Sequence, residues 1–194
     1  DDIMPTADEE PSNGLTGLKG GVSMPGTGFN YEIALMGATI DIGYSDTSEA
    51  NATDDGGNSA GAAADASSSI SVQMSPMEGL SVFGGTGSHG QADGKDLDHD
   101  IYGLTYAFGP VTVGYQHNEM DDSDSAGSDY ETDMLAISFA VNDSLSISYG
   151  DQETETSASG VDQEVSGISI GYSVGGMTFK AHANEADNAG HVSG

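Results

Sequence analysis

Residues 101–115 decide the fold, and they read Ile101-Tyr-Gly-Leu-Thr-Tyr-Ala-Phe-Gly-Pro-Val-Thr-Val-Gly-Tyr115. From Tyr102 onward, large apolar side chains alternate with small or polar ones on both sides of Gly109-Pro110. Strict alternation is typical of a β-strand whose two faces meet different surroundings. A Gly-Pro dipeptide between two such runs indicates a tight turn. The stretch therefore predicts an antiparallel hairpin with one apolar and one polar face.

The same alternation returns in four further pairs of runs along the chain. These pairs are 31–35 with 40–44, 70–75 with 80–82, 135–139 with 145–149, and 168–172 with 177–183. Gly, Asn and Asp at the short turns within the pairs are expected to supply the positive φ that tight hairpins need. The connections between the pairs are mostly long and acidic. We therefore expect about ten strands, with short turns at one end and long loops at the other.

The chain is strongly acidic, with 32 Asp plus Glu against 3 Lys plus Arg and a net charge of −29. Phosphate binding needs clustered Lys or Arg, so nucleic acid is excluded as a partner. Acidity with few aromatics is also typical of disorder. Here the acids gather in stretches 46–65, 93–100, 119–133 and 151–164, while apolar β-branched runs lie between them. This segregation favours ordered strands joined by solvated loops.

Two absences limit the fold further. There is no Cys, so disulfides and thiolate metal sites are excluded. No run approaches the eighteen or so apolar residues that a membrane helix requires, whereas barrel strands need apolar residues only at alternate positions. The chain starts without an initiator Met or a signal-peptide core, and we expect a mature product or a fragment.

The orientation of the apolar face separates two kinds of protein. A soluble barrel or sandwich would turn that face into a dry core. Small residues dominate the polar face, aromatic residues such as Tyr44, Phe108 and Tyr149 lie near strand ends, and the strands approach membrane-spanning length. These three features favour an apolar face turned toward lipid.

Residues 30–44 and 101–115 both carry an aromatic and aliphatic strand, a turn, and a return strand ending Gly-Tyr. In this pattern the chain resembles the Gram-negative general porins, particularly the acidic porins of alphaproteobacteria, with looser versions over residues 29–183. The resemblance implies an all-β, antiparallel, up-and-down transmembrane β-barrel in the cell outer membrane, commonly a homotrimer surrounded by lipid. General porins usually have sixteen strands and end in an aromatic residue, while this chain ends His191-Val-Ser-Gly194. We therefore expect a partial chain.

The resemblance also divides the chain and assigns pore residues. Residues 1–28 lack alternation and look like the end of the loop that narrows a porin channel, while residues 29–194 supply barrel hairpins; an ordinary solvated loop or a frayed terminus is the alternative for residues 1–28. The candidate constriction acids are Asp1, Asp2, Asp8, Glu9 and Glu10. The candidate lumen residues are Glu32, Asp41, Gln73, Gln116, Lys180 and His182.

Other chemistry has weaker support in the sequence. The acidic loops contain two clusters of Asp, at 93–100 and 121–129, and neither has the spacing of an EF-hand. They are therefore expected to bind Ca²⁺ weakly and diffusely. The candidate ligands are Asp93, Asp96, Asp98, Asp100, Asp121, Asp122, Asp124 and Asp129. A set of His99, Asp100 and His117 has no supporting spacing, and histidines near the loops are expected to be solvated. Gly171-Tyr-Ser-Val-Gly175 matches the nucleophile-elbow pattern, but an elbow requires a following helix and a strand is expected there.

The sequence therefore predicts a non-enzymatic, cation-favouring channel for small hydrophilic solutes, with no cofactor apart from weakly bound Ca²⁺. The competing hypothesis is a secreted, acidic, β-rich surface-layer or filament protein whose loops bind Ca²⁺. Solubility without detergent would distinguish the second from the first.

Overall fold

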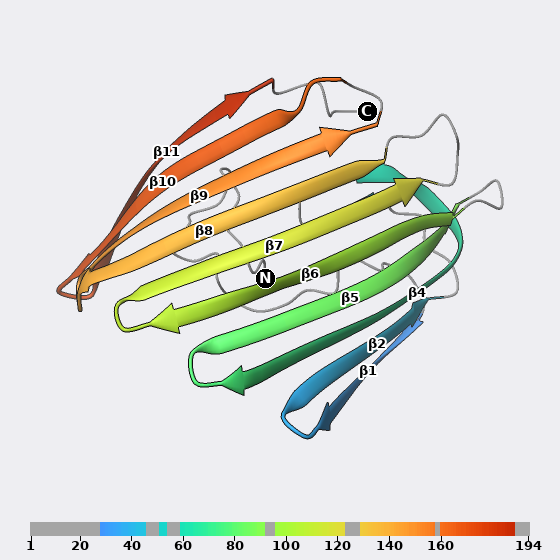
Figure 1. Ribbon diagram of the computed structural model, residues 1–194, viewed down its shortest axis with the longest axis horizontal. Helices are drawn as coiled ribbons and strands as arrows, with labels where there is room; N and C mark the ends of the chain where they lie inside the picture. The colour runs from blue at the N-terminus through green and yellow to red at the C-terminus, as the bar shows by residue number, and fades with distance from the viewer. Residues whose placement is uncertain are drawn as a thin grey trace.

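The computed structural model describes residues 28–45, 51–53, 59–91, 96–122, 129–157 and 160–188. These residues form a single antiparallel sheet (Figure 1). Its strands are β1 (Gly28–Leu35), β2 (Ala38–Ser45), β3 (Asn51–Thr53), β4 (Ser59–Met77), β5 (Leu80–Gln91), β6 (Asp96–Phe108), β7 (Val111–Asp122), β8 (Tyr130–Asn142), β9 (Leu145–Thr156), β10 (Gln163–Val174) and β11 (Met177–Asp187). The described part of the chain has no helix long and apolar enough to cross a membrane.

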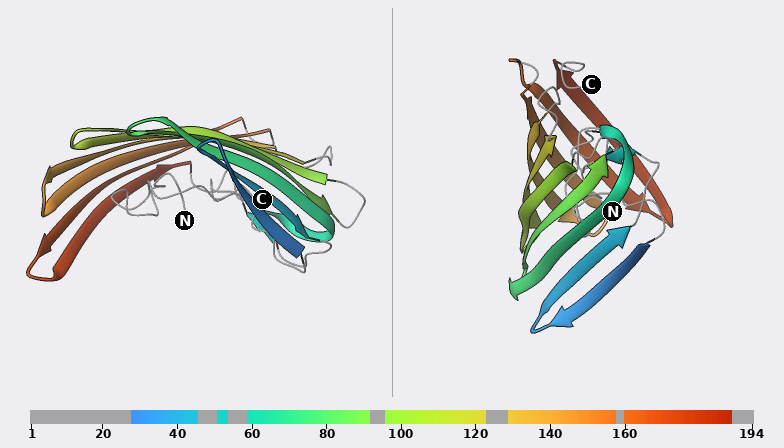
Figure 2. Two further views of the ribbon diagram at one scale, coloured as in Figure 1. Left: turned by 90° about the horizontal axis from the view of Figure 1, so that it is seen from below. Right: turned by 90° about the vertical axis from the view of Figure 1, so that its right-hand side faces the viewer.

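The sheet is an up-and-down meander in which, apart from β3, each strand pairs with the strands before and after it. Its order is β1-β2-β4-β5-β6-β7-β8-β9-β10-β11, and β3 pairs with β4 away from this path. Figure 2 shows that the sheet is strongly curved, with β1 and β11 at its two edges. The predicted all-β up-and-down architecture is confirmed.

The hairpin turns are short and share one end of the sheet (Figure 1). At the first turn Met36 and Gly37 have φ of 52° and 84°, which is the backbone of a tight hairpin turn with two left-handed residues. Asn142 and Asp143 do not have positive φ, contrary to expectation. Instead the Asn142 side-chain oxygen accepts hydrogen bonds from the backbone N–H groups of Ser144 and Leu145, at 2.9 and 3.1 Å. Asn can close a turn through its side chain as well as through its backbone.

The strands extend further into the acidic stretches than the sequence predicts. Strand β3 and the start of β4 lie within 46–65, and β6 begins at Asp96, β7 ends at Asp122 and β9 ends at Thr156. Residues 96–100, 119–121 and 151–155 also alternate, with charged residues in place of apolar ones on one face. Because backbone hydrogen bonds do not depend on side-chain polarity, the ladder continues past the apolar band. The prediction of loops over 93–100, 119–133 and 151–164 is therefore wrong in part.

The apolar face is the exposed one. Ile137 and Ile170 are 45% and 42% exposed, whereas Thr132 and Ser169 on the other face are 0% exposed. Ile147 is half-buried. Side chains on the concave side of a curved sheet converge, so the buried polar set lies on the concave side. A dry apolar interior, as a soluble barrel or sandwich would have, is excluded for these residues.

Buried apolar side chains, among them Leu97, Met120 and Tyr130, also lie on the polar face, and four others form a cluster. Phe83, Ile101, Met134 and Ala136 are all buried there. Phe83 lies directly opposite Gly103 on β6, and a Cβ at Gly103 would collide with the Phe83 ring and with the Tyr115 carbonyl oxygen. Gly103 therefore allows the ring to lie against the neighbouring strand.

We expect Gly103→Ala to destabilise the sheet by about 3 kcal/mol, because one of the colliding atoms belongs to the backbone and cannot rotate away. The measurement is the thermal loss of the β-sheet circular dichroism signal of the protein folded in detergent. Gly84→Ala is the matched control, since its Cβ would meet the nearest atom at 3.5 Å, which is ordinary contact. Equal stability of the two variants would contradict the close contact of Gly103 with the Phe83 ring and the Tyr115 carbonyl oxygen.

Candidate functional site

All six residues that the sequence predicts to line the lumen lie on the polar face of the sheet. Opposite positions across antiparallel strands share a face. Glu32 lies opposite Asp41, and Asp41 lies opposite Ser71. At the other edge of the sheet, Lys180 and His182 follow one another on the same face of β11. The two carboxylates therefore lie toward one edge of the curved surface, and Lys180 and His182 lie at the other.

These side chains differ in how open they are. Glu32, Lys180 and His182 are exposed, while Asp41 and Gln73 are half-buried. The Gln73 amide nitrogen donates a hydrogen bond to the Ser81 hydroxyl at 3.1 Å. Gln116 is only 1% exposed, and its amide nitrogen donates to the Asn118 side-chain oxygen at 3.1 Å. Gln116 is thus covered, unlike the residues at the two edges.

Hydroxyl groups of β8, β9 and β10 form part of the polar face. The hydroxyls of Thr132 and Thr154 lie 3.1 Å apart, and the Gln152 amide nitrogen donates to Thr154 at 3.2 Å. Ser148 and Ser169 lie opposite each other, and their buried hydroxyl oxygens have no hydrogen-bond partner within the described ranges. Buried hydroxyls need a partner, which water in contact with this face would supply.

The nucleophile-elbow match is not an elbow. Ser173 lies near the end of β10, and a strand, β11, follows after two turn residues. The hydroxyls of Ser173 and Thr178 lie 3.0 Å apart across this hairpin. The arrangement lacks the strand-to-helix turn that exposes a nucleophilic serine.

The opposite, apolar face becomes acidic beyond Tyr102 and Tyr115, toward the long-loop end. Asp98 lies opposite Asp121, and Asp100, Glu119, Glu131 and Glu155 form a row in which each residue lies opposite the next. Like charges placed opposite one another across strands are destabilising. Burial, and then the nearby charges of Asp129, Asp98 and Asp100, raise the pKa of Asp121. Burial and the charges of Glu164 and Asp162 likewise raise the pKa of Glu153.

The candidate Ca²⁺ ligands do not all converge. Asp96, Asp98 and Asp100 alternate along β6 on the exposed face. Asp121 shares that face, while Asp122 points to the other side and its backbone N–H donates to the Asp129 carboxylate at 3.1 Å. Asp93 and Asp124 lie outside the described residues, as do the proposed constriction acids Asp1, Asp2, Asp8, Glu9 and Glu10.

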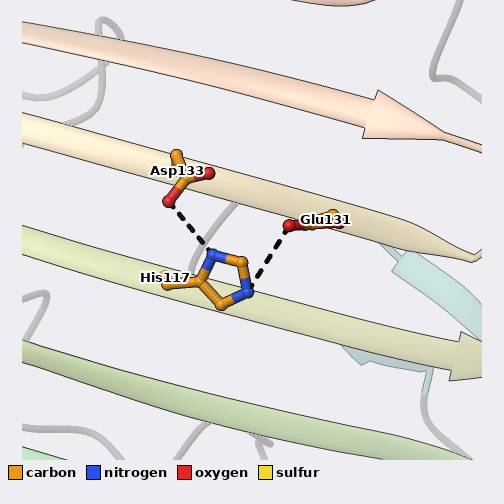
Figure 3. A group of neighbouring side chains, drawn as sticks. All are labelled: His117, Glu131 and Asp133. Atoms are coloured by element: carbon orange, nitrogen blue, oxygen red, sulfur yellow. Dashed lines mark hydrogen bonds and ion pairs between the residues drawn. The ribbon is translucent and has the colours of Figure 1, made fainter.

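The expectation of solvated histidines near the loops is wrong for His99 and His117. His99 is buried on the polar face, whereas His117 lies on the opposite face and is 8% exposed. The two rings cannot share a metal ion with Asp100, since they lie on opposite sides of the sheet. The His117 Nδ1 lies 3.0 Å from the Asp133 carboxylate and its Nε2 lies 3.9 Å from Glu131 (Figure 3). The signal in the sequence was the alternation of His117 with Glu119 and of Glu131 with Asp133.

Comparisons with known proteins agree with this architecture. A family model described as Gram-negative porin matches residues 6–191. A solved structure of a porin refined at 1.8 Å resolution has a TM-score of 0.64 and 13% identity, and the match covers 84% of this chain and 57% of that one. OmpTdeltaL8, a loop L8 deletion mutant of OmpT, an outer membrane protein of Vibrio cholerae, has a TM-score of 0.54 and 15% identity, with coverage of 81% and 56%.

No curated protein sequence matches the chain. At identities of 13% and 15% the two structural matches show the fold alone. The chain spans 57% and 56% of the lengths of those two proteins.

We expect Asp121→Asn to stabilise the protein at neutral pH. The folded protein holds the Asp121 proton more tightly than the unfolded chain does, so this group favours folding at low pH and the benefit is lost as the pH rises through the raised pKa. The gain from Asp121→Asn should shrink toward pH about 4, the ordinary carboxyl value. The measurement is the thermal unfolding midpoint in detergent at several pH values.

Asp143→Asn, in a short turn at the opposite end of the sheet, is the control for removing one negative charge. If Asp121→Asn lowers the midpoint at neutral pH, or shifts it equally at every pH, charge crowding at Asp121 is ruled out.

Proposed function

Because the chain belongs to the Gram-negative porin family, whose members are β-barrel channels of the outer membrane, we propose that it lines a water-filled pore for small hydrophilic solutes. The observation that carries this proposal is the inverted sheet, with Ile137 and Ile170 exposed on one face and Thr132 and Ser169 buried on the other. Lipid would cover the apolar face, as in barrels that alternate apolar and polar residues along each strand. Water would fill the concave side.

The mechanism of the proposed pore is geometric and electrostatic. Strands hold a wall of hydroxyl and amide groups, and solutes pass without any covalent step, so we assign no enzymatic role to the chain. Glu32 and Asp41 would raise the local concentration of cations at one side of the lumen. Lys180 and His182 would face them from the other side. A wall with separated charges of this kind orients polar solutes, and the overall charge of −29 favours cations.

The constriction is proposed to come from the segment before β1. We propose that its acids Asp1, Asp2, Asp8, Glu9 and Glu10 narrow the pore and attract cations.

The assembly around the pore is also a proposal. The edges β1 and β11 each pair on one side only within the described ranges, so a closed wall requires further strands between them. We propose a homotrimer in lipid, as is general for porins, and weak association of Ca²⁺ with the acidic row at the loop end.

Cysteine labelling in lipid vesicles tests the orientation of the sheet. The chain has no Cys, so Asp41→Cys and Ile42→Cys each introduce a single thiol, on the polar and the apolar face respectively. We expect a water-soluble maleimide to modify the Asp41→Cys variant at least about tenfold faster, since lipid covers the apolar face. A lipid-soluble maleimide should reverse the order. Faster reaction of the Ile42→Cys variant with the water-soluble reagent would overturn the proposal.

Charge reversal tests the constriction. We expect Asp8→Lys, Glu9→Lys and Glu10→Lys together to lower the cation-over-anion permeability ratio of the channel about several-fold, because the narrowest part of a pore dominates its selectivity. The measurement is the reversal potential in planar bilayers under a salt gradient. Asp96→Lys, Asp98→Lys and Asp100→Lys together are the control, since these residues lie on the outer face.

Two results would contradict different parts of the proposal. Unchanged selectivity in the first triple variant would remove the constriction assignment and leave the pore intact. If the unsubstituted protein gave no conductance step, the proposal that the chain lines a pore would be wrong.

A further inference from the structure

A cluster of potential metal ligands lies on the outer face of the sheet, away from the proposed lumen. It consists of His117 on β7 with Glu131 and Asp133 on β8, and Figure 3 shows the two carboxylates turned toward the ring from the neighbouring strand. His117 lies directly opposite Asp133 and diagonally from Glu131. One potential ligand atom from each residue lies within 4.8 Å of the others. The register of two strands therefore brings a nitrogen ligand and two oxygen ligands to one place.

The His117 ring is held in a fixed orientation. Its residue is 8% exposed, and its ring stacks on Tyr102 with centroids 4.8 Å apart and planes at 27°. Its Nδ1 lies 3.0 Å from the Asp133 carboxylate, which also accepts a hydrogen bond from the Tyr115 hydroxyl. A carboxylate on one ring nitrogen fixes the tautomer that leaves the other nitrogen with a lone pair, as in the carboxylate–histidine pairs that support zinc.

The remaining nitrogen faces Glu131 at a suitable distance. The His117 Nε2 and the Glu131 Oε1 are 3.9 Å apart. Zinc binds imidazole nitrogen and carboxylate oxygen with bonds of about 2.0 to 2.2 Å, so a small rotation of the exposed Glu131 side chain toward the ring would bring both atoms within bonding distance of one ion. A further carboxylate lies beside this pair on the same face, since Glu119 lies opposite Glu131, and these two glutamates line one pocket of about 250 Å³. Water in that pocket can reach Glu131.

The charge around the cluster favours a cation. Asp100, Glu119, Glu131 and Glu155 form one row of opposed carboxylates. Hard ions such as Ca²⁺ prefer six to eight oxygen ligands, whereas an imidazole with few carboxylates suits zinc-like ions. The buried imidazole is what distinguishes this place from the rest of the acidic surface.

We propose that His117 Nε2 and the Glu131 carboxylate bind a divalent transition-metal ion of the Zn²⁺ class, with Glu119 as a further ligand. Asp133 is a positioning residue that holds the ring through Nδ1. The ion links β7 to β8 above the apolar band and offsets part of the repulsion within the acidic row. The proposal does not depend on whether the protein conducts ions.

The test is Zn²⁺ and Co²⁺ binding to the protein folded in detergent, with excess Ca²⁺ present to occupy the diffuse acidic surface. We expect one site per chain, with a Co²⁺ visible spectrum typical of nitrogen and oxygen ligands. Glu131→Gln changes an exposed side chain, so it should leave folding intact while weakening Zn²⁺ binding about tenfold or more. Asp133→Asn should weaken binding about 10- to 100-fold, as loss of a ring-orienting carboxylate does.

Two matched controls separate this site from general acidity. His182→Ala removes an exposed imidazole from the other face, and Glu153→Gln removes a carboxylate from the same acidic face. Neither should change Zn²⁺ affinity. His117→Ala should abolish the nitrogen contribution to the Co²⁺ spectrum. If Ca²⁺ displaces the ion, or if Glu153→Gln weakens binding as much as Glu131→Gln does, no defined site exists and the proposal fails.

Discussion

The two-residue period of the β-strand is the constraint on which the rest of the structure depends. Because successive side chains point to opposite faces, one register fixes the surroundings of every residue in the sheet. A shift of one residue at β8 would place Ile137 on the concave side and Thr132 on the outside. The pairing of Ile137 with Val113 and Tyr149 holds that register across three strands. Apolar exposure on one side and polar burial on the other then follow together.

Most of the fold could be predicted from alternation alone. The hairpin of Tyr102 to Tyr115 shows why, since its apolar residues, its turn and its polar partners are all adjacent in sequence. The ends of the strands could not be predicted, because Asp98 and Glu153 continue the ladder although their composition is that of a loop. The turn between Leu35 and Ala38 lies where the alternation places it, but the positive φ of Met36 could not be predicted, because the residues expected to adopt positive φ at such turns are Gly, Asn and Asp.

The sequence predicts on which face of the sheet each candidate site residue lies, but not how deeply its side chain is buried. Alternation places Asp41 and Lys180 on the polar side, yet it gives no measure of how deeply each side chain is covered. Gln116 is 1% exposed between β6 and β8, so its burial depends on the neighbouring strands and not on its own sequence context. The contact of His117 with Asp133 depends on the register between β7 and β8, and neither residue reveals that register by itself.

Among the described residues, β1 and β11 each pair on one side only, and these edges have a consequence for how the protein is made. An open edge presents a row of free N–H and C=O groups that would pair with any extended segment, including another copy of the same sheet. In hydrocarbon such groups are too costly to leave unsatisfied. The edges of the sheet must therefore be shielded from other chains until they have paired, so the sheet is most vulnerable during its assembly rather than after its edges have paired.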